Sequence, residues 1–329
     1  MALPARAAEP VPVVATFSIL GDLVRNVGGD RIALTTLVGP DGDGHVYSPT
    51  PADARRVAQA RLVVKNGLDF EGWIDRLIES SGTQATIVVA ADGIDELENE
   101  EHEDHHDHAH GHGHSHAHGH GHAHGHSHDH GHAHGHAHAH AHAHAHAHDH
   151  HDHGPIDPHA WQDVQAVKVY VANIRDGLIA VDPDGREVYE ANAAAFIEEL
   201  AALDAEIRAT IAAIPEDRRL VVTSHDAFAY FSRAYGLEFV APQGVSTDAE
   251  ATARDVASLI TQIRETGASA VFVENITDER LVRRIADEAG VPVGGTLFSD
   301  ALSPADGPAP TYIEMMRHNI RTLSAALAS

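Results

Sequence analysis

The chain has 329 residues, 43% of them hydrophobic, with a formal net charge of −27 and no cysteine. This length suffices for two ordinary domains. The acidic balance argues against a nucleic-acid partner, because phosphate binding needs a basic surface. Without cysteine, disulfides and thiolate metal sites are excluded, so any transition-metal site must use His, Asp and Glu.

The N-terminal residues resemble the end of a secretory leader. Ala5, Arg6 and Ala7 match a signal-peptide cleavage site, but no apolar segment precedes them. Either a leader has been removed and Met1 added, which we favour, or the chain has an ordinary irregular start. No run of about 20 apolar residues exists, so we expect no membrane span.

The first ninety residues alternate short apolar runs with segments of helical apolar spacing. Strands are expected at residues 12–16, 32–38, 62–64 and 86–90. Helices are expected between them, at residues 17–24, 51–60 and 70–80. This order of strand and helix is typical of a parallel sheet covered by helices.

Residues 98–154 break this pattern and contain almost no apolar residue beyond alanine. The chain has 31 histidines, and all but four of them lie in this insert, many alternating with Ala or Gly. Such small residues cannot supply the buried face of a strand. We therefore expect the insert to be disordered when it is free of metal.

A second alternating region follows the insert. A helix is expected at 164–180, and apolar residues then recur at helical spacing up to residue 214. That second helix would have about 30 residues and a length of about 45 Å, enough to brace two lobes. Beyond it, strands and helices are expected in turn at residues 220–223, 226–235, 237–240, 248–266, 270–274, 278–289, 291–297 and 311–327.

These elements predict an α/β fold of two Rossmann-like lobes with parallel sheets, joined by a long rigid helix. We assign the N-terminal lobe, with the insert, to residues 10–182 and the connecting helix to residues 183–214. The C-terminal lobe then covers residues 215–329. A cleft between the lobes is the natural place for a ligand, since open parallel sheets bind ligands at the carboxyl ends of their strands.

Four side chains outside the insert are candidates for a metal site in that cleft. His45, His225 and Asp300 follow predicted strands, and His159 lies in a Pro-flanked loop between the lobes. Three imidazoles and one carboxylate would fill the tetrahedral shell that Zn²⁺ prefers. Taken singly, each is more simply explained as a capping or surface residue. His318, on the last predicted helix, is assigned to that structural role.

The motifs around these residues carry a family resemblance. The segments GHVYSPTPAD, DPHAW, SHDAFAYF and LFSDALS resemble the cluster A-I (ZnuA/TroA/AztC-like) solute-binding proteins of zinc and manganese ABC importers. The resemblance covers nearly the whole chain except the insert. It implies two lobes joined by one rigid helix, with a buried metal bound by His45, His159, His225 and Asp300.

The resemblance also favours zinc as the cargo. Manganese members usually carry Glu at the third ligand position, where this chain has His225, and imidazole suits zinc. With no cysteine and with Asp300 as fourth ligand, the chain is most similar to the AztC-type zinc subgroup. We therefore expect a periplasmic, monomeric zinc-binding protein that serves the membrane permease of a zinc ABC importer. Resemblance to this subgroup adds a periplasmic zinc metallochaperone as a second partner.

Two other functions stay open. A manganese or iron importer component would use the same cleft with another cargo. A zinc hydrolase would need an open water position on the metal, so four protein ligands and the absence of an HExxH motif argue against an enzyme.

The insert corresponds to the His-rich mobile loop of zinc-specific members. We expect it to collect or buffer zinc at low affinity, because ordering so many residues costs backbone entropy. A passive solvated linker is one alternative, and a nickel or copper store is another, because imidazole does not discriminate strongly among these metals. The candidate auxiliary ligands are His102, His105, His106, His108, His150, His151 and His153.

Overall fold

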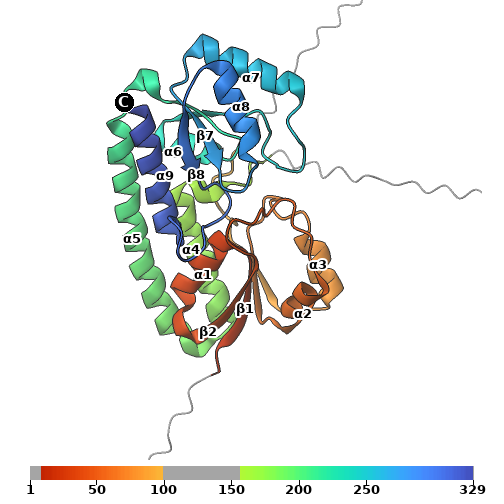
Figure 1. Cartoon of the computed structure of the whole chain (residues 1–329). Coiled ribbons are helices and arrows are strands. Elements are labelled where there is room, and N and C mark those ends of the chain that lie inside the picture. Colours follow the sequence, from red (N-terminus) through yellow and green to blue (C-terminus); the bar gives the residue numbers. More distant parts are fainter. Residues whose placement is uncertain (1–8, 99–155, 329) are drawn as a thin grey trace, which may run out of the picture. The chain divides into compact units, whose positions relative to one another are not determined.

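The computed structural model describes residues 9–98 and 156–328 (Figure 1). The expected disorder of the insert therefore lies outside the described residues. So do its candidate auxiliary ligands His102, His105, His106, His108, His150, His151 and His153.

The first lobe is built on a four-stranded parallel sheet in the order β2-β1-β3-β4. Its strands are β1 (Val11–Phe17), β2 (Ile32–Val38), β3 (Leu62–Lys65) and β4 (Thr86–Val89). Its helices are α1 (Ser18–Gly28), α2 (Pro51–Gln59), α3 (Ile74–Ser81) and α4 (Val164–Val181). The central strands β1 and β3 are almost fully buried, as their continuous apolar runs predict for a sheet covered on both faces.

The second lobe repeats this plan with a parallel sheet in the order β6-β5-β7-β8. Its strands are β5 (Leu220–Val222), β6 (Glu238–Val240), β7 (Val271–Glu274) and β8 (Val293–Leu297). Its helices are α6 (Ala229–Tyr235), α7 (Ala253–Thr266), α8 (Glu279–Ala289) and α9 (Tyr312–Leu327). The predicted fold class is confirmed. Within the described residues, no helix has the length and apolar character to cross a lipid bilayer.

Helix α5 (Arg186–Ala212) braces the two lobes. It packs against α1 and α4 of the first lobe and against α6 and α9 of the second (Figure 1). Its buried positions recur every three or four residues and form one continuous stripe: Tyr189, Ala193, Phe196, Leu200, Leu203, Ile207 and Ile211. This stripe belongs to a hydrophobic core that contains buried residues from both lobes. The lobes therefore pack against α5 in one shared core and are not merely connected by a linker.

Two helices of the second lobe begin later than the sequence indicated. Helix α7 starts at Ala253, because Thr252 and Asp255 form a reciprocal capping box in which each side chain accepts the other's backbone N–H. Helix α6 starts at Ala229, which leaves the residues after β5 as an irregular loop.

In the first lobe, α3 begins at Ile74 rather than at Phe70. The buried carboxylate of Glu71 accepts the backbone N–H of Asn66 at 2.7 Å. This contact holds the preceding residues in turns that bury Phe70 and Trp73. The same carboxylate accepts the hydroxyl of Thr16 on β1 at 2.5 Å, so a tertiary polar contact overrides the local helical pattern.

The stripe on α5 gives a stability prediction. Leu203→Ala removes a side chain with no solvent exposure, so we expect the free energy of unfolding to fall by about 2–5 kcal/mol. Glu199→Ala, on the exposed face of the same helix, should change it by less than about 0.5 kcal/mol. Urea unfolding of the metal-free protein measures both. Equal effects of the two substitutions would show that α5 does not carry the shared core.

Candidate metal centre

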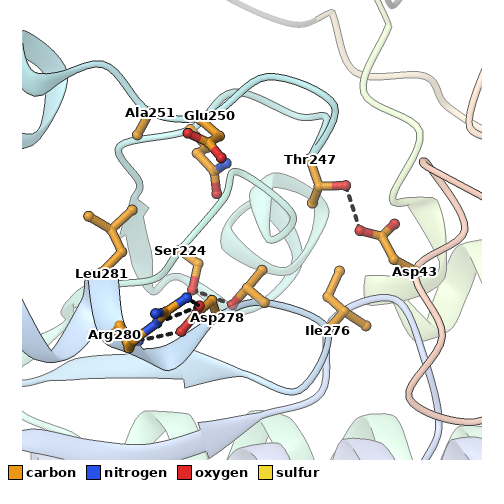
Figure 2. A pocket seen from close by; sticks show the side chains of 11 residues that line it. Asp43, Ser224, Thr247, Glu250, Ala251, Ile276, Asp278, Arg280 and Leu281 are labelled. Carbon is orange, nitrogen blue, oxygen red and sulfur yellow. Dashed lines mark hydrogen bonds and ion pairs between the residues drawn. The ribbon is translucent and has the colours of Figure 1, made fainter.

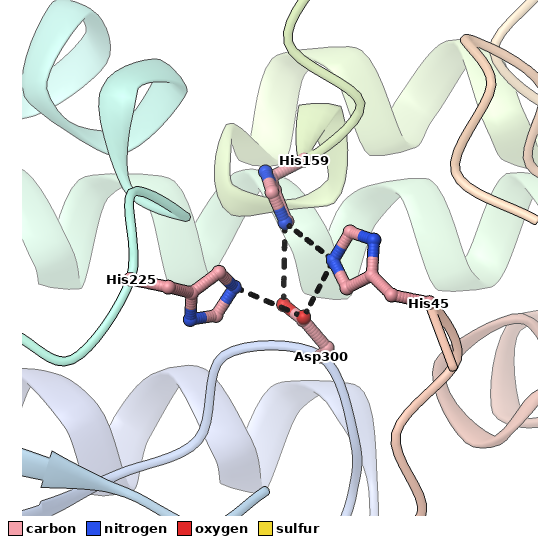
Figure 3. A group of neighbouring side chains, drawn as sticks. All are labelled: His45, His159, His225 and Asp300. Atoms are coloured by element: carbon pink, nitrogen blue, oxygen red, sulfur yellow. Dashed lines mark hydrogen bonds and ion pairs between the residues drawn. The ribbon is translucent and has the colours of Figure 1, made fainter. Parts of the chain in front are cut away.

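Four loops bring together the side chains that the sequence singled out (Figure 3). His45 follows β2, His225 follows β5 and Asp300 follows β8, while His159 lies just before α4. One ligand atom from each lies within 4.8 Å of the others. His318 lies apart from this cluster, on α9, with its Nε2 2.9 Å from a backbone carbonyl oxygen.

Several of these atoms lie about as close together as the ligands of a tetrahedral metal shell. His45 Nε2 lies 3.3 Å from His159 Nε2 and 3.2 Å from Asp300 Oδ2. Asp300 Oδ2 also lies 3.2 Å from His225 Nε2, and Asp300 Oδ1 lies 3.7 Å from His159 Nε2. Four ligands bound at about 2.0–2.1 Å in a tetrahedron would be about 3.3–3.4 Å apart. The arrangement therefore fits one small cation at its centre.

Burial leaves polar atoms of the cluster without hydrogen bonds. His159, His225 and Asp300 have no solvent exposure, and His45 is 5% exposed. Neither oxygen of Asp300 accepts a well-formed hydrogen bond from any described residue, and His225 Nε2 has none either. A buried carboxylate without donors is costly. A divalent cation among the four side chains would satisfy these atoms.

Two further carboxylates hold two of the imidazoles. Asp157 Oδ1 accepts the backbone N–H of His159 at 2.8 Å and lies 2.8 Å from its Nδ1. Glu274 Oε2 lies 2.6 Å from His225 Nδ1, and its Oε1 accepts the backbone N–H groups of Ser224 and His225. Such outer carboxylates fix the ring orientation and leave Nε2 free to bind a metal.

The sequence analysis did not identify Asp157 or Glu274 as functional. Asp157 belongs to the DPHAW motif, two residues before His159. Glu274 ends β7, the neighbour of β5, at the carboxyl edge where ligands bind. Position at that edge was therefore a signal that could have found Glu274.

His45 is oriented by different contacts. Its backbone N–H donates to Asp43 Oδ1 at 2.9 Å, and its ring packs edge-on against Phe70 with centroids 4.6 Å apart. Asp43 Oδ2 in turn accepts the hydroxyl of Thr247, from the second lobe, at 2.6 Å. A hydrogen bond between Asp43 and Thr247 therefore links the loop that carries His45 to the second lobe.

A pocket of about 440 Å³ lies beside the cluster on the second-lobe side (Figure 2). Asp43, Ser224 and Thr247 line it, as does the ion pair of Asp278 with Arg280. None of the four clustered side chains lines this pocket. The cluster is therefore enclosed by the protein, with the pocket next to it rather than around it.

The buried charges shift the pKa values of the cluster. Burial lowers the pKa of His159, but Asp300 and Asp157 raise it to about 9. Burial likewise opposes charge on His225, yet Glu274 and Asp300 raise its pKa well above the usual value. For His45 burial dominates and lowers the pKa. A metal must therefore displace protons from His159 and His225, because only neutral imidazole coordinates.

Asp300 shows the opposite shift. Burial raises its pKa, but the charges on His225 and His159 lower it well below the usual value. The metal-free cluster is therefore an ion-pair network in which the protonated imidazoles of His159 and His225 supply the positive charge next to Asp300.

Comparison with known proteins identifies the family. The sequence profile of the ZnuA family, described as the periplasmic component A of zinc-uptake complexes, matches residues 13–326. The chain belongs to this family. The predicted membership in the cluster A-I solute-binding proteins is confirmed, and with it an extracytoplasmic, non-enzymatic role as the metal-binding component of an ABC importer. Such a component implies a membrane permease as partner.

Individual relatives bind different metals. The manganese-binding lipoprotein MntA of Halalkalibacterium halodurans is 30% identical over 320 residues, which are 97% of this chain and 89% of the relative. The periplasmic zinc-binding protein TroA of Treponema pallidum has a similar structure, with 28% identity, a TM-score of 0.78, and coverage of 98% of this chain and 100% of that one. A manganese-bound periplasmic protein of Candidatus Liberibacter asiaticus, a mutant form, has 25% identity, a TM-score of 0.76, and coverage of 97% and 100%.

The pKa of His159 gives a pH prediction for the metal-free protein. Its folded-state pKa of about 9 lies above the ordinary histidine value of 6.5, so protonation of His159 stabilises the fold. This stabilisation is complete below about pH 6.5 and is lost as the pH rises through about 9. We expect the free energy of unfolding to decline across this window, as measured by urea unfolding.

Asp157→Asn should flatten that decline, because it removes a carboxylate that raises the pKa. Asp217→Asn, at an exposed position, serves as control and should leave the decline unchanged. A free energy of unfolding that stays constant from pH 6.5 to 9 in the parent protein would contradict the assignment.

Proposed function

We propose that the protein captures Zn²⁺ outside the cytoplasm and delivers it to the permease of an ABC importer. His45, His159, His225 and Asp300 are the ligands in this proposal. The observation that carries it is the convergence of three imidazole nitrogens and one carboxylate at tetrahedral spacing. Imidazole suits zinc, whereas sites built of oxygen suit manganese. Four protein ligands also leave no open position for a reacting water, which suits carriage of the metal.

Manganese is the second candidate cargo, and the relatives support it. MntA is named as manganese-binding, and so is the lipoprotein PsaA of Streptococcus pneumoniae, which is 27% identical over 325 residues. TroA, at a similar identity, is described as a zinc-binding protein. Overall identity therefore supports both metals. We favour zinc because the donor atoms of this chain are mostly nitrogen.

The shared core suggests how the cargo is carried. In this proposal the functional division is a first lobe at 10–182, a connecting helix at 183–214 and a second lobe at 215–329. Because α5 packs against both lobes, they move little relative to one another when zinc binds. Release then occurs on docking to the permease.

We also place the chain in the AztC-type subgroup. The absence of cysteine and the presence of Asp300 support this placement. A periplasmic metallochaperone is then a direct source of zinc for the buried site.

A competition titration tests the choice of metal. We expect Zn²⁺ to displace Mn²⁺ from the protein at equal concentrations, as read by calorimetry and metal analysis. His225→Glu replaces a nitrogen ligand by oxygen and should lower the preference for zinc over manganese by about tenfold, because imidazole suits zinc whereas carboxylate oxygen suits manganese. His318→Glu, away from the cluster, should leave the preference unchanged. Displacement of Zn²⁺ by Mn²⁺ in the parent protein would reject zinc as the cargo.

The His-rich insert gives a second prediction. We propose that it collects zinc at low affinity through His102, His105, His106, His108, His150, His151 and His153. Deletion of residues 102–153 should abolish the weak sites and leave one tight site, as counted by calorimetry. Loss of the tight site in this variant would contradict the assignment of the main site to the lobes.

A further inference from the structure

The segment that carries Asp300 is fixed on both of its sides. On one side, Phe298 donates its backbone N–H to Asn319 Oδ1 at 2.9 Å, and its carbonyl oxygen accepts a hydrogen bond from Asn319 Nδ2 at 2.8 Å. On the other side, the backbone N–H of Leu302 donates to Ser18 Oγ of the first lobe at 2.9 Å. Side chains from α9 and from α1 therefore hold the two flanks of one short loop.

Between these flanks, one carbonyl group accepts two side-chain donors. The carbonyl oxygen of Ser299 accepts Trp161 Nε1 and Gln162 Nε2, each at 2.8 Å. Ser299 directly precedes Asp300, and the two donors lie two and three residues after His159. The loops that carry two members of the cluster are thus joined by two buried hydrogen bonds, one residue away from Asp300.

The two donors are held differently. The ring of Trp161 packs against Phe17 and Phe70, with centroids 5.0 and 4.8 Å apart, so its place belongs to the aromatic core. Gln162 is fully buried, and its Oε1 finds no hydrogen-bond donor among the described residues. A buried amide with an unsatisfied oxygen is unfavourable for stability. Apolar packing therefore does not account for a glutamine at this buried position, whereas its hydrogen bond to the carbonyl oxygen of Ser299 does.

We propose that Trp161 and Gln162 are positioning residues for Asp300. They hold its carboxylate at ion-pair distance from the imidazoles before the metal arrives, so that metal binding needs no rearrangement of the loop. A carbonyl oxygen has two lone pairs, so that of Ser299 can accept both donors at once. The inference rests on the proposed role of the cluster in metal binding, and it concerns how one ligand is placed rather than which metal is carried.

Gln162→Met tests the inference through a cycle with Asp300→Ala. In the parent protein, Gln162→Met should lower zinc affinity about fivefold, as expected for one buried hydrogen bond. In the Asp300→Ala background the same substitution should change affinity less than about twofold, because the carboxylate that it positions is absent. Chelator competition measures the four affinities. Gln165→Met, the same change at an exposed position nearby, should have no effect in either background.

Trp161→Phe combined with Gln162→Met extends the test. Loss of both donors leaves the Ser299 carbonyl unsatisfied, so zinc affinity should fall by at least about tenfold, again only when Asp300 is present. The visible spectrum of the Co²⁺-loaded protein should change with it, as the oxygen ligand is displaced. Should this variant fail to fold, the cycle with Gln162→Met decides by itself.

The outcomes separate this inference from the proposed function. If Asp300→Ala weakens metal binding but Gln162→Met does not, or if Gln162→Met acts equally in both backgrounds, the positioning role is wrong. If Asp300→Ala leaves the affinity of both Zn²⁺ and Mn²⁺ unchanged, the proposed ligand set is wrong instead. If the coupling appears and the protein prefers Mn²⁺, the positioning role stands and only the choice of cargo fails.

Discussion

The carboxylate of Asp300 lies fully buried among three imidazoles, with no well-formed hydrogen bond from a described residue. In the metal-free protein, its charge is balanced by protons on His159 and His225, whose pKa values are raised accordingly. A divalent cation can replace these protons and coordinate all four side chains at once. Much of the surrounding structure serves to keep these charged groups at that spacing.

The two parallel sheets supply three of the four clustered side chains, and the core shared by the lobes keeps them close together. The side chains that follow β2, β5 and β8 come from the carboxyl edges of both sheets, so the cluster exists only while both lobes hold their places. Helix α5 packs against both lobes along one apolar stripe. Asp157 and Glu274 then set the orientation of single rings. Stability, geometry and metal affinity are thereby coupled in one structure.

The strands could be predicted from the sequence because apolar runs are local signals. The four candidate side chains were weak signals singly and were selected by their joint placement and by the family resemblance, and the structure brings them together. The start of α3 could not be predicted, since it depends on the carboxylate of Glu71, which accepts the side-chain hydroxyl of the distant Thr16 as well as the nearby backbone N–H of Asn66. The hydrogen bond from Gln162 to Ser299 joins residues 137 positions apart, and no sequence pattern in either segment indicates it. Local patterns therefore locate the ligands, whereas tertiary contacts decide how firmly they are held.

The central claim is that four side chains enclose one divalent ion between the lobes. Crystals of the zinc-loaded protein, measured above and below the zinc absorption edge, would locate that ion directly. The account predicts one strong anomalous peak, about 2.0–2.1 Å from the Nε2 atoms of His45, His159 and His225 and at a similar distance from an oxygen of Asp300. A peak at any other place in the lobes, with no metal among these four side chains, would contradict it.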